Sequence, residues 1–226
     1  MSFLLDALAW LFGPGQWTGE AILLGLLGEH LATTVIAVAV AVVIAVPLGW
    51  WIGHTGRGRE IAVAVTGAAR AIPSFGLLVL LVLLLGVTRR PEAALITFVI
   101  LAIPSLLAGA YSGIEAIDRR VVDAARAVGM TEGQVFWRVE VPLGLPLLLG
   151  GLRTSVLQVV ATVTIAAYLN LGGLGLPIIT GLSLRQYDQV LGGALLVVAL
   201  ALMLDALLAL AQRAAVPAGI RLAARR

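Results

Sequence analysis

The chain has 226 residues, of which 61% are hydrophobic and only 12% charged, whereas soluble domains contain about 25% charged residues. All 15 basic residues are arginine, and with 12 acidic residues the formal net charge is +3 and the pI about 10.2. In so apolar a chain, this excess of arginine indicates membrane topology rather than nucleic-acid binding. Cysteine is absent and the two histidines lie far apart, which excludes disulfides, thiolate metal sites and cysteine nucleophiles and gives no pattern for a metal site.

The N-terminal part of the chain predicts one interfacial segment and two membrane spans. Residues 1–28 contain two short amphipathic stretches, FLLDALAWLF and AILLGLLGEHL, which suit a segment lying at the membrane surface on the periplasmic side. A span needs about 20 apolar residues, and we expect the first at about 29–52 and the second at about 60–87. Pro73 lies inside the second span and predicts a kink or break near 70–75, because proline removes an intrahelical hydrogen bond.

Three further spans are expected in the rest of the chain, at about 93–113, 147–168 and 189–211. A charged loop, 114–146, separates the first two of these, and a glycine-rich loop containing NLGGLGLP separates the last two. The chain ends in a basic tail, 213–226, which we expect in the cytoplasm. The predicted fold is therefore an all-α, polytopic membrane protein with a core of five helices.

Arginine counts predict the orientation of these spans. If the loop before the second span is cytoplasmic, the inside loops and the tail contain ten arginines and the outside loops three. Because arginine is enriched in cytoplasmic loops, this distribution favours an N-out, C-in topology. An alternative remains in which the second span divides at Pro73, which would give six spans and move the N-terminus to the other side.

The loop 114–146 is the largest that this topology places in the cytoplasm, and its charges are spaced for a helix. Arg119, Asp123 and Arg126 fall at positions i, i+4 and i+7 of one helical face, with opposite charges next to each other. A second face is small and apolar and comprises Val121, Ala125 and Val128.

The same loop contains signals for a helix end and a second helix start. Gly129 stands where a helix C-cap needs a residue that can adopt positive φ. Thr131 begins TEGQ, which matches a capping box and predicts a second short helix at about 132–139. Pro142 and Pro146 are typical of a turn back into the membrane. A helix–Gly–helix of this kind could be a solvated loop, a DNA-binding helix-turn-helix or a docking element, although tethers at both ends leave little room for a duplex.

A spaced motif favours the docking element. Asp123-Ala124-Ala125 is followed after three residues by Gly129, and after nine more by Val139-Glu140-Val141-Pro142. This resembles the E-A-A…Gly…Ile/Val-x-Leu-Pro loop in permease subunits of binding-protein-dependent ABC importers, with Asp for Glu and Val for Leu. The resemblance implies a cytoplasmic coupling helix that sits in a cleft of the ATPase subunit and passes on its nucleotide-driven closure. The coupling residues it implies are Arg120, Asp123, Ala124, Ala125, Arg126, Gly129, Val139 and Pro142.

The resemblance extends over about 29–212 and includes RAIPSFGLLVLLVLLLG and the stretch from VEVPLG to LNLGGLG. These segments are similar to the osmoprotectant, or quaternary amine, branch of the family, whose members carry glycine betaine, choline or carnitine. Methionine importers share the five-helix core and part of the LGGLG motif, so an amino-acid permease remains the alternative. In either case, the resemblance implies a subunit of the bacterial cytoplasmic (inner) membrane.

The partners implied by the resemblance are a dimer of ATP-binding subunits, a second permease that is identical or homologous, and a separate periplasmic or lipid-anchored substrate-binding protein. ATP and Mg²⁺ would be bound by the ATPase, so no cofactor is expected in this chain. The runner-up classes are an intramembrane enzyme and a secondary transporter. The spans offer only the isolated Asp205 and Arg70 to catalysis, and 226 residues leave little room for the internal repeats typical of a secondary transporter.

The translocation path needs only weakly polar groups, because the resemblance implies that the binding protein holds the substrate tightly. Serine and threonine in a span could instead bond the i−4 carbonyl or a neighbouring helix, and the glycines could form a gate or a plain tight turn. Asp205 and Arg70 could pair with each other. The residues expected along the path or at its gate are Pro73, Ser74, Thr162, Thr164, Tyr168, Asn170, Gly172, Gly173 and Gly175.

Overall fold

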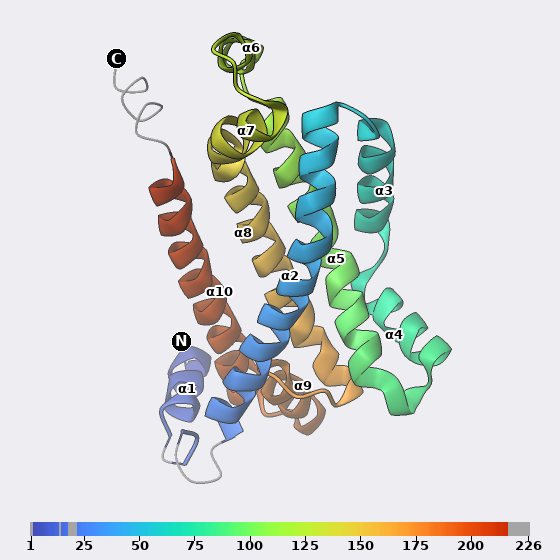
Figure 1. The fold of residues 1–226 in the computed structure, drawn as a ribbon. Helices are drawn as coiled ribbons and strands as arrows, with labels where there is room; N and C mark the ends of the chain where they lie inside the picture. Colours follow the sequence, from blue (N-terminus) through green and yellow to red (C-terminus); the bar gives the residue numbers. More distant parts are fainter. Residues whose placement is uncertain (1, 14, 18–21, 217–226) are drawn as a thin grey trace. The chain divides into compact units, whose positions relative to one another are not determined.

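A computed structural model describes residues 2–13, 15–17 and 22–216, and all regular secondary structure within them is helical (Figure 1). The predicted all-α membrane fold is confirmed. The elements are α1 (Ser2–Leu11), α2 (Ile22–Thr55), α3 (Arg59–Ala71), α4 (Ser74–Leu85), η1 (Val87–Arg89), α5 (Arg90–Glu115), α6 (Arg119–Ala127), α7 (Glu132–Val135), η2 (Phe136–Glu140), α8 (Val141–Ala166), η3 (Ala167–Leu169), α9 (Gly175–Leu184) and α10 (Tyr187–Ala215).

The predicted break in the second span is confirmed. Helix α3 ends at Ala71 and α4 begins at Ser74, and Pro73 is the extended N-cap of α4, with φ −60° and ψ 121°. At 1.5 Å per residue the two helices are only about 20 and 18 Å long, too short for either to cross a hydrocarbon core of about 30 Å alone. Counted as one broken span, they join four long apolar helices, giving up to five spans within the described residues.

The first long helix begins earlier than the sequence suggests. Residues 22–28 belong to α2 and not to an interfacial segment. Glu29 and His30 lie within α2, and both side chains accept hydrogen bonds from the glycine-rich turn that precedes α9. The tail was predicted to begin at residue 213, but α10 continues to Ala215, and residues 217–226 lie outside the described part of the chain.

Two loops contain more helix than expected. The glycine-rich loop after the fourth span includes α9, an apolar helix of 10 residues. The charged loop does not extend to residue 146, because α7, η2 and α8 form one continuous helical segment, Glu132–Leu169 together with η3. Its non-helical connections are therefore 116–118 and 128–131, and α6 is its only separate helix among the described residues.

The chain forms two compact units, and each long helix contributes a segment to both. Among the described residues, unit 1 comprises 2–13, 15–17, 22–39, 72–101 and 156–204, and a buried cluster of Leu26, Val160, Leu174 and Leu200 lies in it. Unit 2 comprises 40–71, 102–155 and 205–216, and a buried cluster of Val46, Ala110 and Leu148 lies in it.

Glycines bring α5 and α8 into backbone contact within unit 2. A Cβ added to Gly113 would lie 2.5 Å from the carbonyl oxygen of Gly144, and one added to Gly109 would lie 2.9 Å from the Cα of Gly151. Apolar driving forces between helices are weak in lipid, so membrane helices associate through close contacts of small residues such as these.

In unit 2, α5 also packs against α2, and glycines of α2 lie at this contact. A Cβ on Gly49 would collide with that of Ala110, and one on Gly53 would lie 2.7 Å from that of Ile114. Gly49 and Gly53 form a G-x-x-x-G pattern, as do Gly109 and Gly113 on α5. Small residues therefore allow these helices to approach closely in unit 2, and the paired glycines are the signal for this packing in the sequence.

Candidate functional site

The end of α6 has the geometry that Gly129 predicts. Gly129 has φ of +88°, its N–H donates to the Arg126 carbonyl at 2.9 Å, and the Met130 N–H donates to the Ala125 carbonyl at 3.2 Å. These two bonds form a Schellman motif, in which the residue after the helix takes the left-handed region. The predicted C-cap is confirmed, and the reason for glycine is its backbone conformation, since nothing lies within 4 Å of an added Cβ.

The predicted capping box is also present. The Thr131 hydroxyl accepts from the Gln134 N–H at 3.4 Å, and the Gln134 side chain accepts from the Thr131 N–H at 3.0 Å. The short helix expected at 132–139 is instead α7 followed by a π-helical turn, η2. Pro142 follows this turn and has no N–H to donate to the Arg138 carbonyl, so an α-helical bond is missing where the wider turn occurs.

Arg126 ties α6 to α7. Its Nε and Nη2 donate to the two carboxylate oxygens of Glu132 at 2.8 and 2.9 Å, and its Nη1 lies 3.6 Å from Asp123. The hydrogen bonds to Glu132 raise the pKa of Arg126 and lower that of Glu132, so both stay charged. The predicted Asp123–Arg126 pair is confirmed. The guanidinium of Arg126 is bonded to carboxylates of the loop itself, whereas a coupling residue is expected to face the partner subunit.

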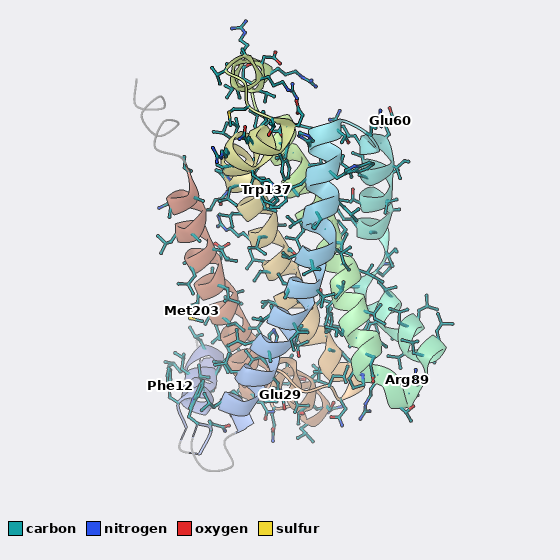
Figure 2. The ribbon with its side chains drawn as sticks, viewed as in Figure 1. Phe12, Glu29, Glu60, Arg89, Trp137 and Met203 are labelled. Carbon is teal, nitrogen blue, oxygen red and sulfur yellow. The ribbon has the colours of Figure 1, made fainter. Side chains whose placement is uncertain are left out.

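The exposed face of the loop is mixed apolar and charged. Val128 and Trp137 are 79% and 62% exposed, and Trp137 projects from the turn after α7 (Figure 2). Arg120 and Ala124 are exposed on α6, whereas Ala125 is buried within the chain. Ala125, one of the implied coupling residues, therefore packs within the chain and not on this exposed face. Of the remaining coupling residues, Val139 and Pro142 are half-buried.

A hydrogen-bonded pair of side chains connects this segment to α2. Glu140, in the π turn, is 5% exposed and lies 2.5 Å from Nδ1 of His54. The ring of Phe136 contacts His54 and Trp50 edge-on, at centroid distances of 5.4 and 5.9 Å, and Trp50 also contacts Trp137 at 5.8 Å. No local pattern in the sequence predicts this cluster, because 86 residues separate His54 from Glu140.

The glycine-rich turn before α9 also has a specific backbone conformation that hydrogen bonds hold in place. Gly172 and Gly173 both have φ of +72°, a region that favours glycine. The Gly173 N–H donates to Glu29 Oε2 at 3.1 Å, and the Leu174 N–H donates to His30 Nδ1 at 3.2 Å. His30 Nε2 then carries the ring proton and donates to the Val160 carbonyl at 3.1 Å. The turn is thus held by two side chains of α2.

Gly175 has a packing role. A Cβ there would collide with the carbonyl oxygen of Thr164. The hydroxyls of Thr164 and Thr162 donate to the carbonyls four residues earlier, at 3.2 and 2.7 Å, and Thr162 is 2% exposed. These two hydroxyls therefore serve their own helix, which is the alternative that the sequence left open.

The remaining path residues lie near the break in the second span. The Tyr168 ring is 55% exposed and packs against the ring of Phe75, next to Ser74, with centroids 5.6 Å apart. Asn170 has φ of +54°, and with Tyr168 and Arg90 it lines a shallow cavity. The structure thus brings the start of α4 and η3 together within unit 1.

Asp205 does not pair with Arg70. Its carboxylate accepts from Nε of Arg153, and also from Nη2 at 2.6 Å, so that α10 and α8 are joined by a bidentate pair in unit 2. Such a pair satisfies charges that would be costly in lipid. In the part of the chain that the structure describes, no three His, Asp or Glu side chains are grouped to hold a metal ion.

Taken together, the long apolar helices, the broken span and the exposed charged loop define a multi-pass α-helical membrane protein. The family model described as "Binding-protein-dependent transport system inner membrane component" matches residues 45–218. The chain therefore belongs to this family of ABC transporter permeases, and it is a transport subunit without a catalytic site of its own.

Curated relatives extend the match over nearly the whole chain. The glycine betaine/carnitine/choline transport system permease protein OpuCB of Bacillus subtilis (strain 168) is 32% identical over 86% of this chain and 88% of its own length. The choline permease OpuBB of the same organism is 32% identical, over 85% and 88%. The osmoprotectant import permease OsmW of Salmonella typhimurium (strain LT2) is 34% identical, over 85% and 91%.

Solved structures of importers share the fold. The MetNI methionine ABC transporter in an inward-facing conformation matches with a TM-score of 0.74 at 22% identity, covering 91% of this chain and 99% of that chain. A crystal structure of an amino acid ABC transporter matches with a TM-score of 0.65 at 17% identity, over 85% and 93%. The expected methionine-importer-like architecture is thus confirmed as a fold.

Proposed function

We propose that this permease forms the membrane path of an ATP-driven importer for a quaternary amine osmoprotectant such as glycine betaine, choline or carnitine. The observation that carries the proposal is the set of three relatives, each above 30% identity over most of both chains, whose names specify these solutes or osmoprotectants. The likeness to methionine importers is below 25% identity and concerns the fold.

The proposed route from ATPase to membrane is the loop between α5 and α8. The Gly129 cap, the capping box and the Arg126–Glu132 hydrogen bonds hold α6 against α7. A movement of the partner against the exposed face of α6 would therefore be transmitted to α7, because the connection between the two helices is held in one conformation. The buried His54–Glu140 pair then connects the π turn to α2. These contacts support docking of an ATP-binding subunit on Arg120, Ala124 and Val128.

The partners in this proposal are a dimer of ATPase subunits, a second permease and a substrate-binding protein. We further propose the N-out, C-in orientation, which puts this loop in the cytoplasm. The short helices α3 and α4 favour five spans over six, because neither helix alone reaches across the bilayer.

We propose that substrate passes near the break at Pro73 and the end of α8. Helical hydrogen bonding is interrupted at both places, and backbone that is not regularly helical is tolerated at membrane depth only where protein or water covers it. The rings of Phe75 and Tyr168, together with Asn170, support a weakly polar surface there. Thr162, which is buried and bonded within its own helix, is not part of this proposed surface.

Uptake measurements test the proposed substrate class. The chain would be co-expressed with its cognate ATPase and binding protein in a bacterial strain that lacks its own osmoprotectant uptake. Radiolabelled glycine betaine, choline, carnitine and methionine would be supplied separately, with an ATPase variant that cannot hydrolyse ATP as the control. We expect ATP-dependent uptake of at least one quaternary amine, whereas uptake of methionine alone would assign the chain to amino-acid import.

A further inference from the structure

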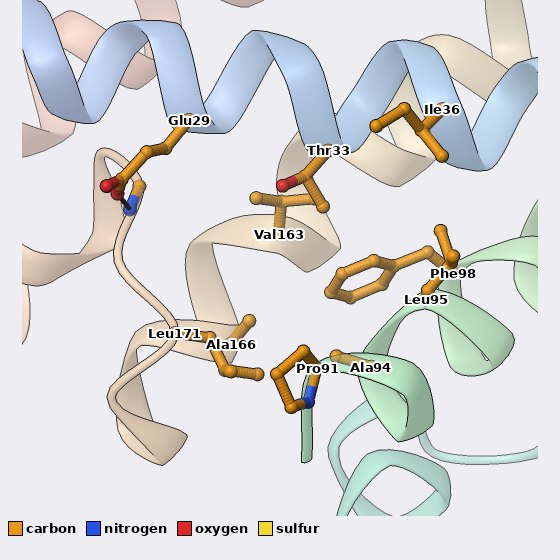
Figure 3. Close-up of a pocket in the computed structure, with 11 residues that line it drawn as sticks. Glu29, Thr33, Ile36, Pro91, Ala94, Leu95, Phe98, Val163, Ala166 and Leu171 are labelled. Carbon is orange, nitrogen blue, oxygen red and sulfur yellow. Dashed lines mark hydrogen bonds between the residues drawn. The ribbon is translucent and has the colours of Figure 1, made fainter. Parts of the chain in front are cut away.

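Unit 1 contains a pocket of about 200 Å³ among α2, α5, the end of α8 and the glycine-rich turn (Figure 3). Pockets for drug-sized ligands measure roughly 300–1,000 Å³, so this one suits a smaller molecule. Small residues preserve the space, since Ala94, Ala166 and Gly173 all line the wall. Each of these three is buried.

A carboxylate stands at one end of this pocket. Glu29 is exposed, and one of its oxygens accepts from the Gly173 N–H at 3.1 Å. Among the described residues, no arginine or histidine forms an ion pair with it. Thr33 follows one helical turn later on α2 and also lines the pocket. The polar end of the pocket thus carries a negative charge that a backbone N–H neutralises only in part.

The rest of the wall is apolar and includes one aromatic ring. Phe98 is 1% exposed, and Figure 3 shows its ring pointing from α5 toward the space between α2 and the glycine-rich turn. A quaternary ammonium group is a large, weakly hydrated cation that is attracted to the face of an aromatic ring within about 6 Å. An apolar cavity with one ring and one carboxylate therefore has the chemistry to hold such a cation while rejecting anions.

We propose that this pocket is a low-affinity binding site, within the permease itself, for the quaternary ammonium group of the transported solute. The inference rests on the proposed function and deepens it by assigning the substrate a binding site formed by Glu29, Thr33 and Phe98. The carboxylate supplies the charge and the Phe98 ring the apolar contact, and access to solvent at Glu29 lets the solute leave again.

The competing explanation is that Glu29 only secures the glycine-rich turn. Glu29→Gln separates the two roles, because the amide oxygen can still accept from the Gly173 N–H while the charge is lost. Phe98→Leu removes the ring and retains an apolar side chain. Glu92→Gln, an identical change at an exposed residue of α5 outside the pocket, is the matched control.

The experiment measures equilibrium binding of radiolabelled choline to the purified permease–ATPase complex without the binding protein. The complex is placed in nanodiscs whose lipids carry no choline headgroup, so that only free solute can occupy the pocket. The uncharged tert-butyl analogue of choline is the competitor that tests the need for a cation. Size-exclusion profiles confirm that each variant is folded and assembled.

We expect wild type and Glu92→Gln to bind choline equally and the uncharged analogue not to compete. Glu29→Gln should weaken binding about tenfold, equivalent to about 1.4 kcal/mol, and Phe98→Leu by about 2- to 30-fold. Absence of choline binding to wild type, or unchanged binding by Glu29→Gln, would overturn the inference. Uptake by wild type with its binding protein, measured in parallel, shows separately whether the proposed function itself has failed.

Discussion

Replacing Gly113 with alanine is a direct test of the backbone contact between α5 and α8. The added Cβ would lie 2.5 Å from the carbonyl oxygen of Gly144 and 3.2 Å from its Cα. Ordinary contacts between non-bonded heavy atoms begin near 3.5 Å, so the two helices must separate by about 1 Å. The obstacle is a backbone carbonyl, which cannot rotate away as the tip of a side chain would.

The size of the effect follows from two opposing contributions. Overpacking of this kind costs about 1–3 kcal/mol, and we expect the upper end because both partners are backbone. Alanine is favoured over glycine in a helix by up to about 1 kcal/mol. The net destabilisation should therefore be about 2 kcal/mol, which for a chain of this size lowers Tm by about 4–8 °C.

The assay is thermal unfolding of the detergent-solubilised protein, followed by size-exclusion chromatography after heating. Gly67→Ala is the control, because nothing lies within 4 Å of a Cβ at Gly67 in the middle of α3, and it should leave Tm unchanged or raise it. The reasoning would be refuted if Gly113→Ala matched wild type, or if Gly67→Ala lost as much stability.

Three further changes test the loop, its orientation and the ion pair. Gly129→Val should lower ATP-driven uptake severalfold while ATPase activity persists, since φ of +88° suits few side chains, whereas Gly129→Asn should retain coupling; equal uptake by both variants would argue against a role for the α6 cap. A cysteine at Val128, which is 79% exposed in a chain without native cysteine, should react with impermeant maleimide only in inverted vesicles when the permease is expressed without its ATPase subunit, and labelling of intact cells would reverse the proposed topology. Asp205→Leu should reduce the yield of folded protein because Arg153 is left as an unpaired charge, and the double change with Arg153→Leu should restore it; a double variant no better than the single would show that the pair contributes more than charge balance.

Local signals in the sequence were enough for much of the fold. Runs of apolar residues longer than a bilayer width predict spans, and Pro73 predicts the break because a proline lacks the N–H of an intact helix. The Gly129 cap and the Thr131 capping box involve residues at most five positions apart, so the sequence specifies them completely. The spaced loop motif likewise led to the family that the comparisons confirm.

The candidate sites depended on contacts that no local rule contains. His54 meets Glu140 across 86 positions, Arg153 meets Asp205 across 52, and His30 holds a turn 144 residues away. Each of these side chains has several possible partners in the sequence. The pairing of Asp205 with Arg70, which the sequence leaves open, is not the one that forms, because Asp205 pairs with Arg153.

The sequence by itself determined which segments are apolar enough to span a membrane, where α6 ends and which family the chain belongs to, because hydropathy and backbone capping act over a few residues. Only the tertiary structure decided which side chains face each other, because helix register is set by close glycine contacts such as Gly113 on Gly144. Within unit 1, the tertiary structure likewise decided that Glu29, Thr33 and Phe98 line one pocket.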